Sequence, residues 1–82
     1  MKFEIYSKFS VGQTVWIVCK YDDGFYKVEK HEIIGIAKYF NSKETSYILS
    51  DEDNLYDEFF IYDKYKDAVI RCKYLNKLYN GW

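Results

Sequence analysis

Residues 14–29 read TVWIVCKYDDGFYKVE, and this stretch decides the fold. Its first seven residues are rich in β-branched and aromatic side chains, which favour an extended strand. Asp23-Gly24 supplies the positive φ that a tight turn requires, and residues 25–29 return as a second strand. The stretch therefore predicts an antiparallel β-hairpin.

Further extended segments follow the hairpin, separated by polar turns. Gly35 interrupts the next of them and predicts a bulge or a tight bend there. The expected strands are residues 32–40, 46–50, 55–56 and 59–62, and the expected turns are residues 41–45 and 51–54. Residues 9–62 should therefore form about five short strands.

The periodicity of the sequence changes after Asp63. Ala68, Cys72, Leu75 and Tyr79 recur at helical spacing, which is typical of an amphipathic helix laid on a core. Asp63 is the expected N-cap, and Asn80-Gly81 is the expected end. A helix is predicted over residues 63–79, packed through Ala68, Cys72 and Leu75.

Length and composition indicate one folded domain spanning residues 1–82. The chain has 82 residues, of which 49% are hydrophobic and 22% aromatic, enough to fill one core and too short for two domains. The predicted class is mainly β with one C-terminal α-helix. Two architectures satisfy it: a small SH3-like barrel, or a strongly bent five-stranded antiparallel sheet packed on the helix.

The opening residues carry a family resemblance. Residues 9–16, FSVGQTVW, resemble the F-x-V-G-x-x-V-W opening of small SH3-like barrel proteins of bacteriophages and mobile elements of low-GC bacteria. Residues 33–36 resemble the central strand of that group, and Tyr56, Glu58, Phe60 and Ala68 resemble its late aromatic and acidic segment and the helix that follows it. The resemblance implies a barrel in which Trp16 packs beside Gly12. It fixes no biochemical activity, because such barrels serve many binding tasks.

Charge is unevenly distributed along a chain whose formal net charge is only −1. Residues 51–63 contain six acidic and no basic residues, whereas residues 64–82 contain five basic residues and one acid. Helix-dipole complementarity explains the charges nearest the helix ends, but not the acids more than one turn before it. An acidic surface studded with amphipathic tyrosine rings is typical of a protein interface.

We therefore predict a non-enzymatic protein-binding module that docks on a partner protein with a basic surface. The predicted contact residues are Asp51, Glu52, Asp53, Asp57, Glu58, Tyr47, Tyr56 and Tyr62. The resemblance to mobile-element proteins suggests a target: a host nucleic-acid-handling defence complex, which the protein would inhibit by occlusion as anti-CRISPR proteins do.

The alternative function is nucleic-acid binding by the basic helix of an SH3-like module. The near-zero net charge argues against general coating of nucleic acid. Exposed aromatic rings could nevertheless stack on bases beside the helix. The residues for this alternative are Lys64, Lys66, Arg71, Lys73 and Lys77.

Catalytic, metal and cofactor sites have no support from spacing. His31 is the only histidine, and it is expected to be exposed. Cys19 and Cys72 have no C-x-x-C partner and are expected to be reduced and buried. A calcium loop opening at Asp51 would place Leu55 where an oxygen ligand is needed, so no metal site is predicted.

Two further expectations concern the aromatic residues and the compartment. An aromatic cage for a methylated cation is an alternative to simple core and rim packing. Its candidates are Trp16, Tyr21, Phe25, Tyr47 and Tyr56. Charged residues break up the N-terminal segment, and no apolar run approaches the length of a membrane span, so a cytoplasmic location is expected.

Overall fold

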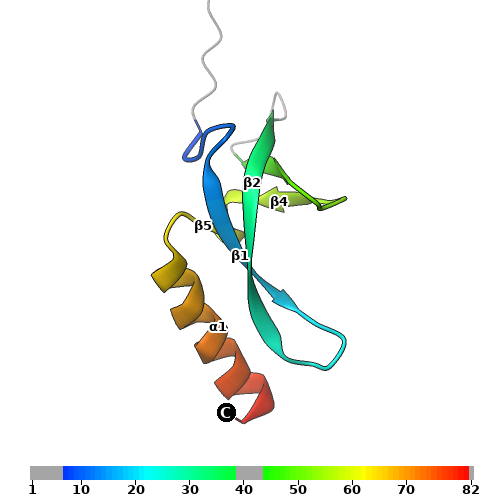
Figure 1. Cartoon of the computed structure of the whole chain (residues 1–82), viewed down its shortest axis with the longest axis vertical. Helices are drawn as coiled ribbons and strands as arrows, with labels where there is room; N and C mark the ends of the chain where they lie inside the picture. Colours follow the sequence, from blue (N-terminus) through cyan, green and yellow to red (C-terminus); the bar gives the residue numbers. More distant parts are fainter. Residues whose placement is uncertain (1–6, 39–43, 82) are drawn as a thin grey trace, which may run out of the picture.

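The computed structural model describes residues 7–38 and 44–81. In this part of the chain, five antiparallel strands form a curled half-barrel sheet, and a C-terminal helix follows (Figure 1). The strands lie in the order β4-β3-β2-β1-β5. The elements are β1 (Thr14–Lys20), β2 (Tyr26–Lys38), β3 (Thr45–Leu49), β4 (Leu55–Asp57), the 3-10 helix η1 (Glu58–Phe60), β5 (Ile61–Tyr62) and α1 (Tyr65–Asn80). The predicted fold class is confirmed.

The predicted hairpin joins β1 to β2. Gly24 adopts a φ of +86°, and its N–H donates to the carbonyl of Tyr21 at 2.9 Å. The Asp23 carboxylate accepts the Phe25 N–H at 2.9 Å, which fixes the return of the chain. Asp23 and Gly24 thus have the turn-forming roles that the sequence predicts.

Strand β2 differs from the prediction because it is continuous. Residues 25–29 and 32–40 are not separate strands; Tyr26–Lys38 form one strand of 13 residues that pairs with β1 and then with β3. The pairing register with β3 shifts between Ile33 and Gly35, which confirms the bulge at Gly35. The predicted turn at residues 41–45 falls largely outside the described residues.

The segment after β3 is also less extended than predicted. Residues 55–57 form a short strand, but Phe59 and Phe60 belong to η1, and only Ile61 and Tyr62 resume as β5. The resulting bend turns both phenylalanine rings outward, where they are 79% and 57% exposed.

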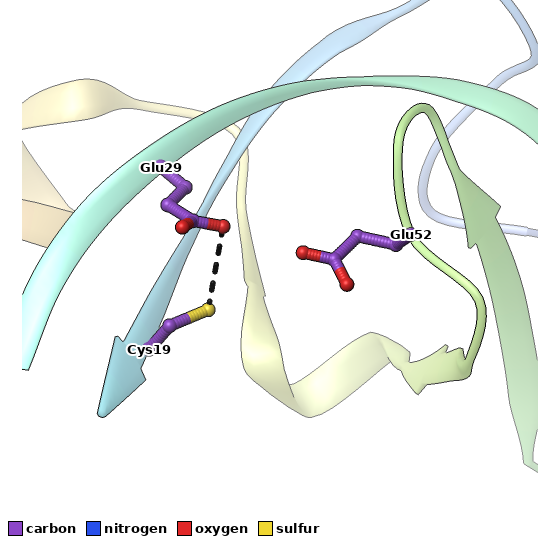
Figure 2. A group of neighbouring side chains, drawn as sticks. All are labelled: Cys19, Glu29 and Glu52. Atoms are coloured by element: carbon purple, nitrogen blue, oxygen red, sulfur yellow. Dashed lines mark hydrogen bonds between the residues drawn. The ribbon is translucent and has the colours of Figure 1, made fainter. Parts of the chain in front are cut away.

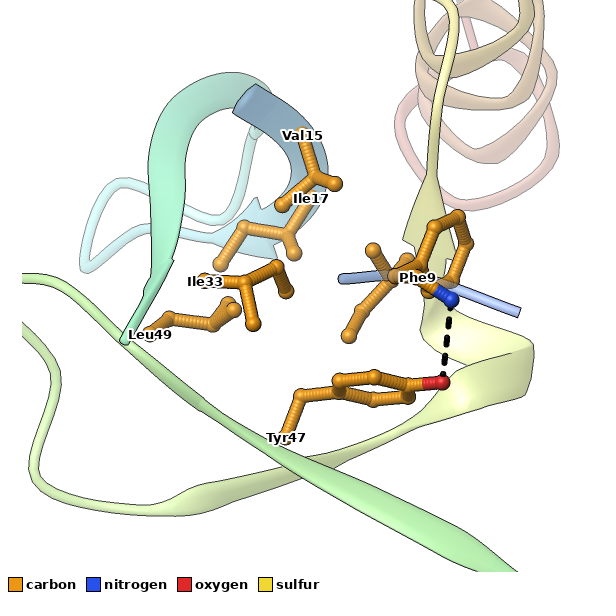
Figure 3. Close-up of a cluster of buried hydrophobic side chains, with 7 residues drawn as sticks. Phe9, Val15, Ile17, Ile33, Tyr47 and Leu49 are labelled. Atoms are coloured by element: carbon orange, nitrogen blue, oxygen red, sulfur yellow. Dashed lines mark hydrogen bonds between the residues drawn. The ribbon is translucent and has the colours of Figure 1, made fainter. Parts of the chain in front are cut away.

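The core lies inside the curl of the sheet (Figure 3). It gathers side chains that are far apart in sequence: Phe9, Val15, Ile17, Ile33, Tyr47, Leu49 and Ile61. Trp16 is not among these core residues. Alternation along β1 turns Trp16 to the other face, where it is half-buried against Tyr65 of α1 at 6.0 Å between ring centroids.

Helix α1 covers that other face of β1 and the adjoining part of β2 (Figure 1). Ala68 is fully buried, while Cys72 and Leu75 are half-buried, so the predicted packing face is confirmed. Gly81 ends the helix in the left-handed conformation with a φ of +72°. Asp63 is not the N-cap; Lys64 holds that position, and no side-chain hydrogen bond caps the helix.

Polar contacts hold the C-terminal half of α1 against the β1–β2 hairpin. The Asn76 side chain accepts the Tyr26 N–H at 2.7 Å and donates to the Tyr26 carbonyl at 2.9 Å. Asn80 donates to the carbonyl of Gly24 at 3.0 Å. The Asn76 amide thus takes the place of a neighbouring strand at this end of β2.

In the described residues, no helix is long and apolar enough to cross a membrane.

Candidate functional site

The three tyrosines of the predicted protein-binding face are not on one surface. Tyr47 is 0% exposed, and its ring packs edge-on against Phe9. Its assignment as a contact residue is wrong, because the alternation of β3 directs Thr45, Tyr47 and Leu49 into the core together. Tyr56 is half-buried and packs against the core, and Tyr62 is half-buried on β5.

The acidic residues of that predicted face are dispersed as well. Asp51, Asp53 and Asp57 are exposed, and Asp57 accepts a hydrogen bond from Ser46 at 3.2 Å. Glu58 is half-buried and accepts the Tyr47 hydroxyl at 2.8 Å. Glu52 turns inward, 3.6 Å from His31. Three of the five acids therefore make contacts within the fold, and two of these three, Glu52 and Glu58, are half-buried.

Tyr47 should make the protein less stable at alkaline pH. Burial raises the pKa of its hydroxyl above the ordinary value of 10.0. At a pH between the unfolded-state and folded-state pKa values, the folded protein therefore keeps a proton that the unfolded chain has lost. This contribution to the free energy of unfolding is fully present below pH 10.0 and declines as pH rises through the folded-state pKa. Urea unfolding at increasing pH should show a steeper decline in wild type than in Tyr47→Phe. Equal declines would contradict this role of Tyr47.

The basic residues proposed for nucleic-acid binding are all exposed on or beside α1. Lys66, Lys73 and Lys77 share one side of the helix at spacings of seven and four residues. The adjacent side carries a stripe of large apolar residues at spacings of four: Ile70, Tyr74 and Leu78, each more than half exposed. Sequence periodicity detected the buried side of the helix but not this second apolar stripe.

An apolar groove of about 230 Å³ lies between α1 and the segment containing η1 and β5. The sequence did not predict this groove, because the unexpected bend at η1 places Phe59 and Phe60 in its lining. Aromatic rings provide most of its lining, and the Arg71 guanidinium lies at its border over the Tyr74 ring, 5.2 Å from the ring centroid. The residues of this aromatic groove are Val18, Tyr26, Phe59, Phe60, Tyr62, Arg71, Leu75 and Tyr79.

A second hollow, of about 350 Å³, lies beside the end of β1. It brings Cys19, Glu29 and Glu52 together, with one ligand atom from each within 4.8 Å of the others (Figure 2). β1 supplies the thiol, β2 supplies Glu29, and the turn after β3 supplies Glu52. Local spacing could not reveal this cluster, because the fold alone brings its members together.

His31 borders this cluster and is only 9% exposed, so the expectation of an exposed histidine is wrong. Alternation along β2 places His31 on the same face as buried Ile33. Its Nδ1 lies 2.6 Å from the carbonyl oxygen of Ser50, and its Nε2 lies 3.1 Å from a Glu29 oxygen. The imidazole therefore connects β2 with the turn that carries Glu52.

The electrostatics of the cluster exclude an activated thiol in the absence of a cation. Burial and the neighbouring Glu29 carboxylate raise the pKa of Cys19 to about 12. Hydrogen bonds from Tyr21 and then from His31 lower the pKa of Glu29. At neutral pH the arrangement is a protonated thiol beside a carboxylate, which is the opposite of a reactive cysteine site. Both cysteines are free and half-buried rather than fully buried.

The five candidates for an aromatic cage are spread over the molecule. Trp16 packs on Tyr65, and Tyr47 packs in the core. Tyr21 and Tyr56 line the hollow beside Cys19, whereas Phe25 lines a different one. These positions favour core and rim packing over a cage.

Comparisons with protein-family models, with curated proteins and with solved structures find no match for this chain.

Proposed function

We propose that the protein is a non-enzymatic protein-binding module whose contact surface is the aromatic groove together with the exposed stripe of α1. The carrying observation is the outward-facing pair Phe59 and Phe60 at the groove, 79% and 57% exposed. Their rings contact each other at 5.3 Å between centroids instead of packing into the core. Exposed apolar surface of this extent is typical of sites that bind other proteins.

Charge supports an acidic partner rather than a basic one. Five basic residues and one acid lie between residues 64 and 82, and the five basic side chains are exposed around the groove and the stripe. No ion pair joins Arg71 to a carboxylate in the part of the chain that the structure describes. The proposed occupant is a protein segment with apolar side chains for the groove and carboxylates for Arg71 and the lysines.

This proposal moves the contact surface from the acidic residues to the helix and η1. Burial of Tyr47 and the internal contacts of Glu52 and Glu58 leave the acidic face without a contiguous apolar centre. Interface energy usually concentrates in such a centre, with charges at its rim. A phage origin and an anti-CRISPR-like role stay predictions from the resemblance.

The test replaces Phe59 and Phe60 together by serine and selects binders from a displayed library of random short peptides. Wild type should enrich peptides that combine apolar residues with Asp or Glu. The double variant should bind a selected peptide at least about tenfold more weakly, because central aromatic residues carry most interface energy. Val11→Ser is the matched control, since Val11 is 62% exposed and lies outside the groove.

Three other outcomes would contradict the proposed partner. Enrichment of Lys- and Arg-rich peptides would favour the basic partner that the acidic face predicts. Salt-sensitive binding to a short DNA duplex, lost on replacing Lys66, Lys73 and Lys77 by alanine but kept in the phenylalanine variant, would favour nucleic acid. Self-association of wild type that the phenylalanine variant abolishes would assign the groove to a second copy of the chain.

A further inference from the structure

The cluster beside the end of β1 contains the ligand types of a transition-metal site. Cys19 Sγ lies 3.6 Å from Glu29 Oε1, and His31 Nε2 lies 3.1 Å from that oxygen and 3.6 Å from Glu52 Oε1. Figure 2 shows Cys19, Glu29 and Glu52 directed toward a common space from three different segments. A thiol and two carboxylates therefore meet at one place, and the imidazole of His31 borders it.

The contacts of His31 hold the two carboxylates beside the thiol. The carbonyl oxygen of Ser50 can only accept a hydrogen bond, so Nδ1, at 2.6 Å, donates to it. This contact directs Nε2 toward the carboxylate oxygens of Glu29 and Glu52, in a side chain only 8% exposed. The imidazole thus fixes one border of the space that Cys19, Glu29 and Glu52 share.

The spacing of the three ligand atoms suits a metal ion. In a tetrahedral zinc site, metal–ligand bonds of about 2.0 to 2.3 Å place neighbouring donors about 3.3 to 3.6 Å apart. Cys19 Sγ lies 3.6 Å from Glu29 Oε1, and the ligand atoms of Cys19, Glu29 and Glu52 all lie within 4.8 Å of one another. The thiol that donates to Glu29 in the metal-free protein is thus placed to become the sulfur ligand.

The surroundings of the cluster resemble those that orient metal ligands in proteins. His31 is held by the Ser50 carbonyl at 2.6 Å and contacts an oxygen of each of the two carboxylates, which orients them. The Tyr21 hydroxyl donates to the second oxygen of Glu29 and leaves the first directed at Cys19 and His31. The hollow of about 350 Å³ opens to solvent and gives an ion a path to the ligands.

We propose that Cys19, Glu29 and Glu52 bind a divalent transition metal of the zinc type, with His31 orienting the two carboxylates. A thiolate ligand selects such ions over calcium and magnesium, which prefer oxygen alone. On binding, the sulfur–metal bond replaces the S–H bond of Cys19, and the released proton goes to solvent. The bound ion joins β1 and β2 to the turn after β3. This site is separate from the aromatic groove and does not depend on the function proposed for it.

The experiment titrates Zn²⁺ into chelator-treated protein by calorimetry and Co²⁺ by absorption spectroscopy. Wild type should bind one equivalent of Zn²⁺ and should melt at a higher temperature with the metal than without it. Cobalt should produce the thiolate-to-metal charge-transfer band that a cysteine ligand causes. This spectrum needs no variant, so a folding defect in a mutant cannot obscure it.

Two pairs of variants assign the ligands. Cys19→Ser and Glu52→Gln should each weaken Zn²⁺ binding at least about tenfold, and Cys19→Ser should abolish the cobalt band. Cys72→Ser and Asp53→Asn are the matched controls, a second half-buried cysteine and an exposed acid of the same turn, and both should bind like wild type. Absence of one-equivalent binding, or equal weakening in test and control variants, would overturn the proposal and leave the cluster as a hydrogen-bond network without a metal.

Discussion

Replacing Tyr47 by alanine should leave the protein largely unfolded. The ring is fully buried between Phe9 and the aliphatic core, so its removal combines the loss of apolar burial with an unfilled cavity. Truncation of a buried aromatic side chain costs about 3–5 kcal/mol, close to the entire stability expected for a domain of this size. Circular dichroism during urea unfolding measures the effect directly.

Two companion variants separate the ring from its hydroxyl. Tyr47→Phe keeps the ring but leaves the Phe9 N–H without its acceptor at 3.3 Å, which should cost about 1–3 kcal/mol. Tyr74→Ala removes a tyrosine that is 54% exposed on α1 and should change stability by only about 0.5 kcal/mol. A Tyr47→Ala protein as stable as Tyr74→Ala would place Tyr47 back on the surface, where the sequence analysis expected it.

Replacing Asn76 by alanine should detach the C-terminal half of α1 from the sheet. The Tyr26 N–H loses its acceptor at 2.7 Å, and the Tyr26 carbonyl loses one of two donors at 2.9 Å and keeps the Cys72 thiol at 3.1 Å. The Asn80 side chain also loses a neighbour at 3.1 Å. Because unpaired polar groups cost about 1–3 kcal/mol each, we expect a loss of about 2 kcal/mol after water replaces part of the contacts. Hydrogen exchange should speed up at residues 72–80 and at Tyr26 but much less in β3.

Lys73→Ala is the control for this second prediction. It changes a neighbouring, exposed position of the same helix and makes none of the contacts to Tyr26. Helix propensity favours alanine slightly at such a position, so exchange should stay as in wild type. Equal acceleration in both variants would mean that intrinsic helix stability, rather than the Asn76 contacts, governs the docking of α1.

Periodicity predicted the elements of this fold because each has an apolar face of regular spacing. The turn at Asp23-Gly24, the bulge at Gly35 and the helix end at Gly81 were predictable from backbone conformations that glycine allows. The sequence could not predict how η1 bends the chain at Phe59, because an apolar pair fits a strand and a short helical turn equally well.

The candidate sites were less predictable than the fold, for different reasons at each residue. In β3, Tyr47 and Ile48 are both apolar enough for the core. Only the position of Tyr47 two residues before Leu49, on the same face of the strand, identifies it as the buried one. The burial of His31 was predictable in the same way, since it lies two residues before Ile33 on the same face of β2. The proximity of Cys19 to Glu52 was not predictable from the sequence, because it depends on how far the sheet curls.

The continuity of β2 also has a consequence for how the protein opens. Its residues up to Glu32 pair with β1, whereas those from Ile33 onward pair with β3, and the register shift lies near the start of the second stretch, between Ile33 and Gly35. The β1–β5–α1 side and the β3–β4 side thus join along one strand and through the core they share. Such an arrangement favours opening in two cooperative steps. The β3–β4 side has only a three-residue edge strand and no helix over it, so it should open first, at a lower free energy than global unfolding.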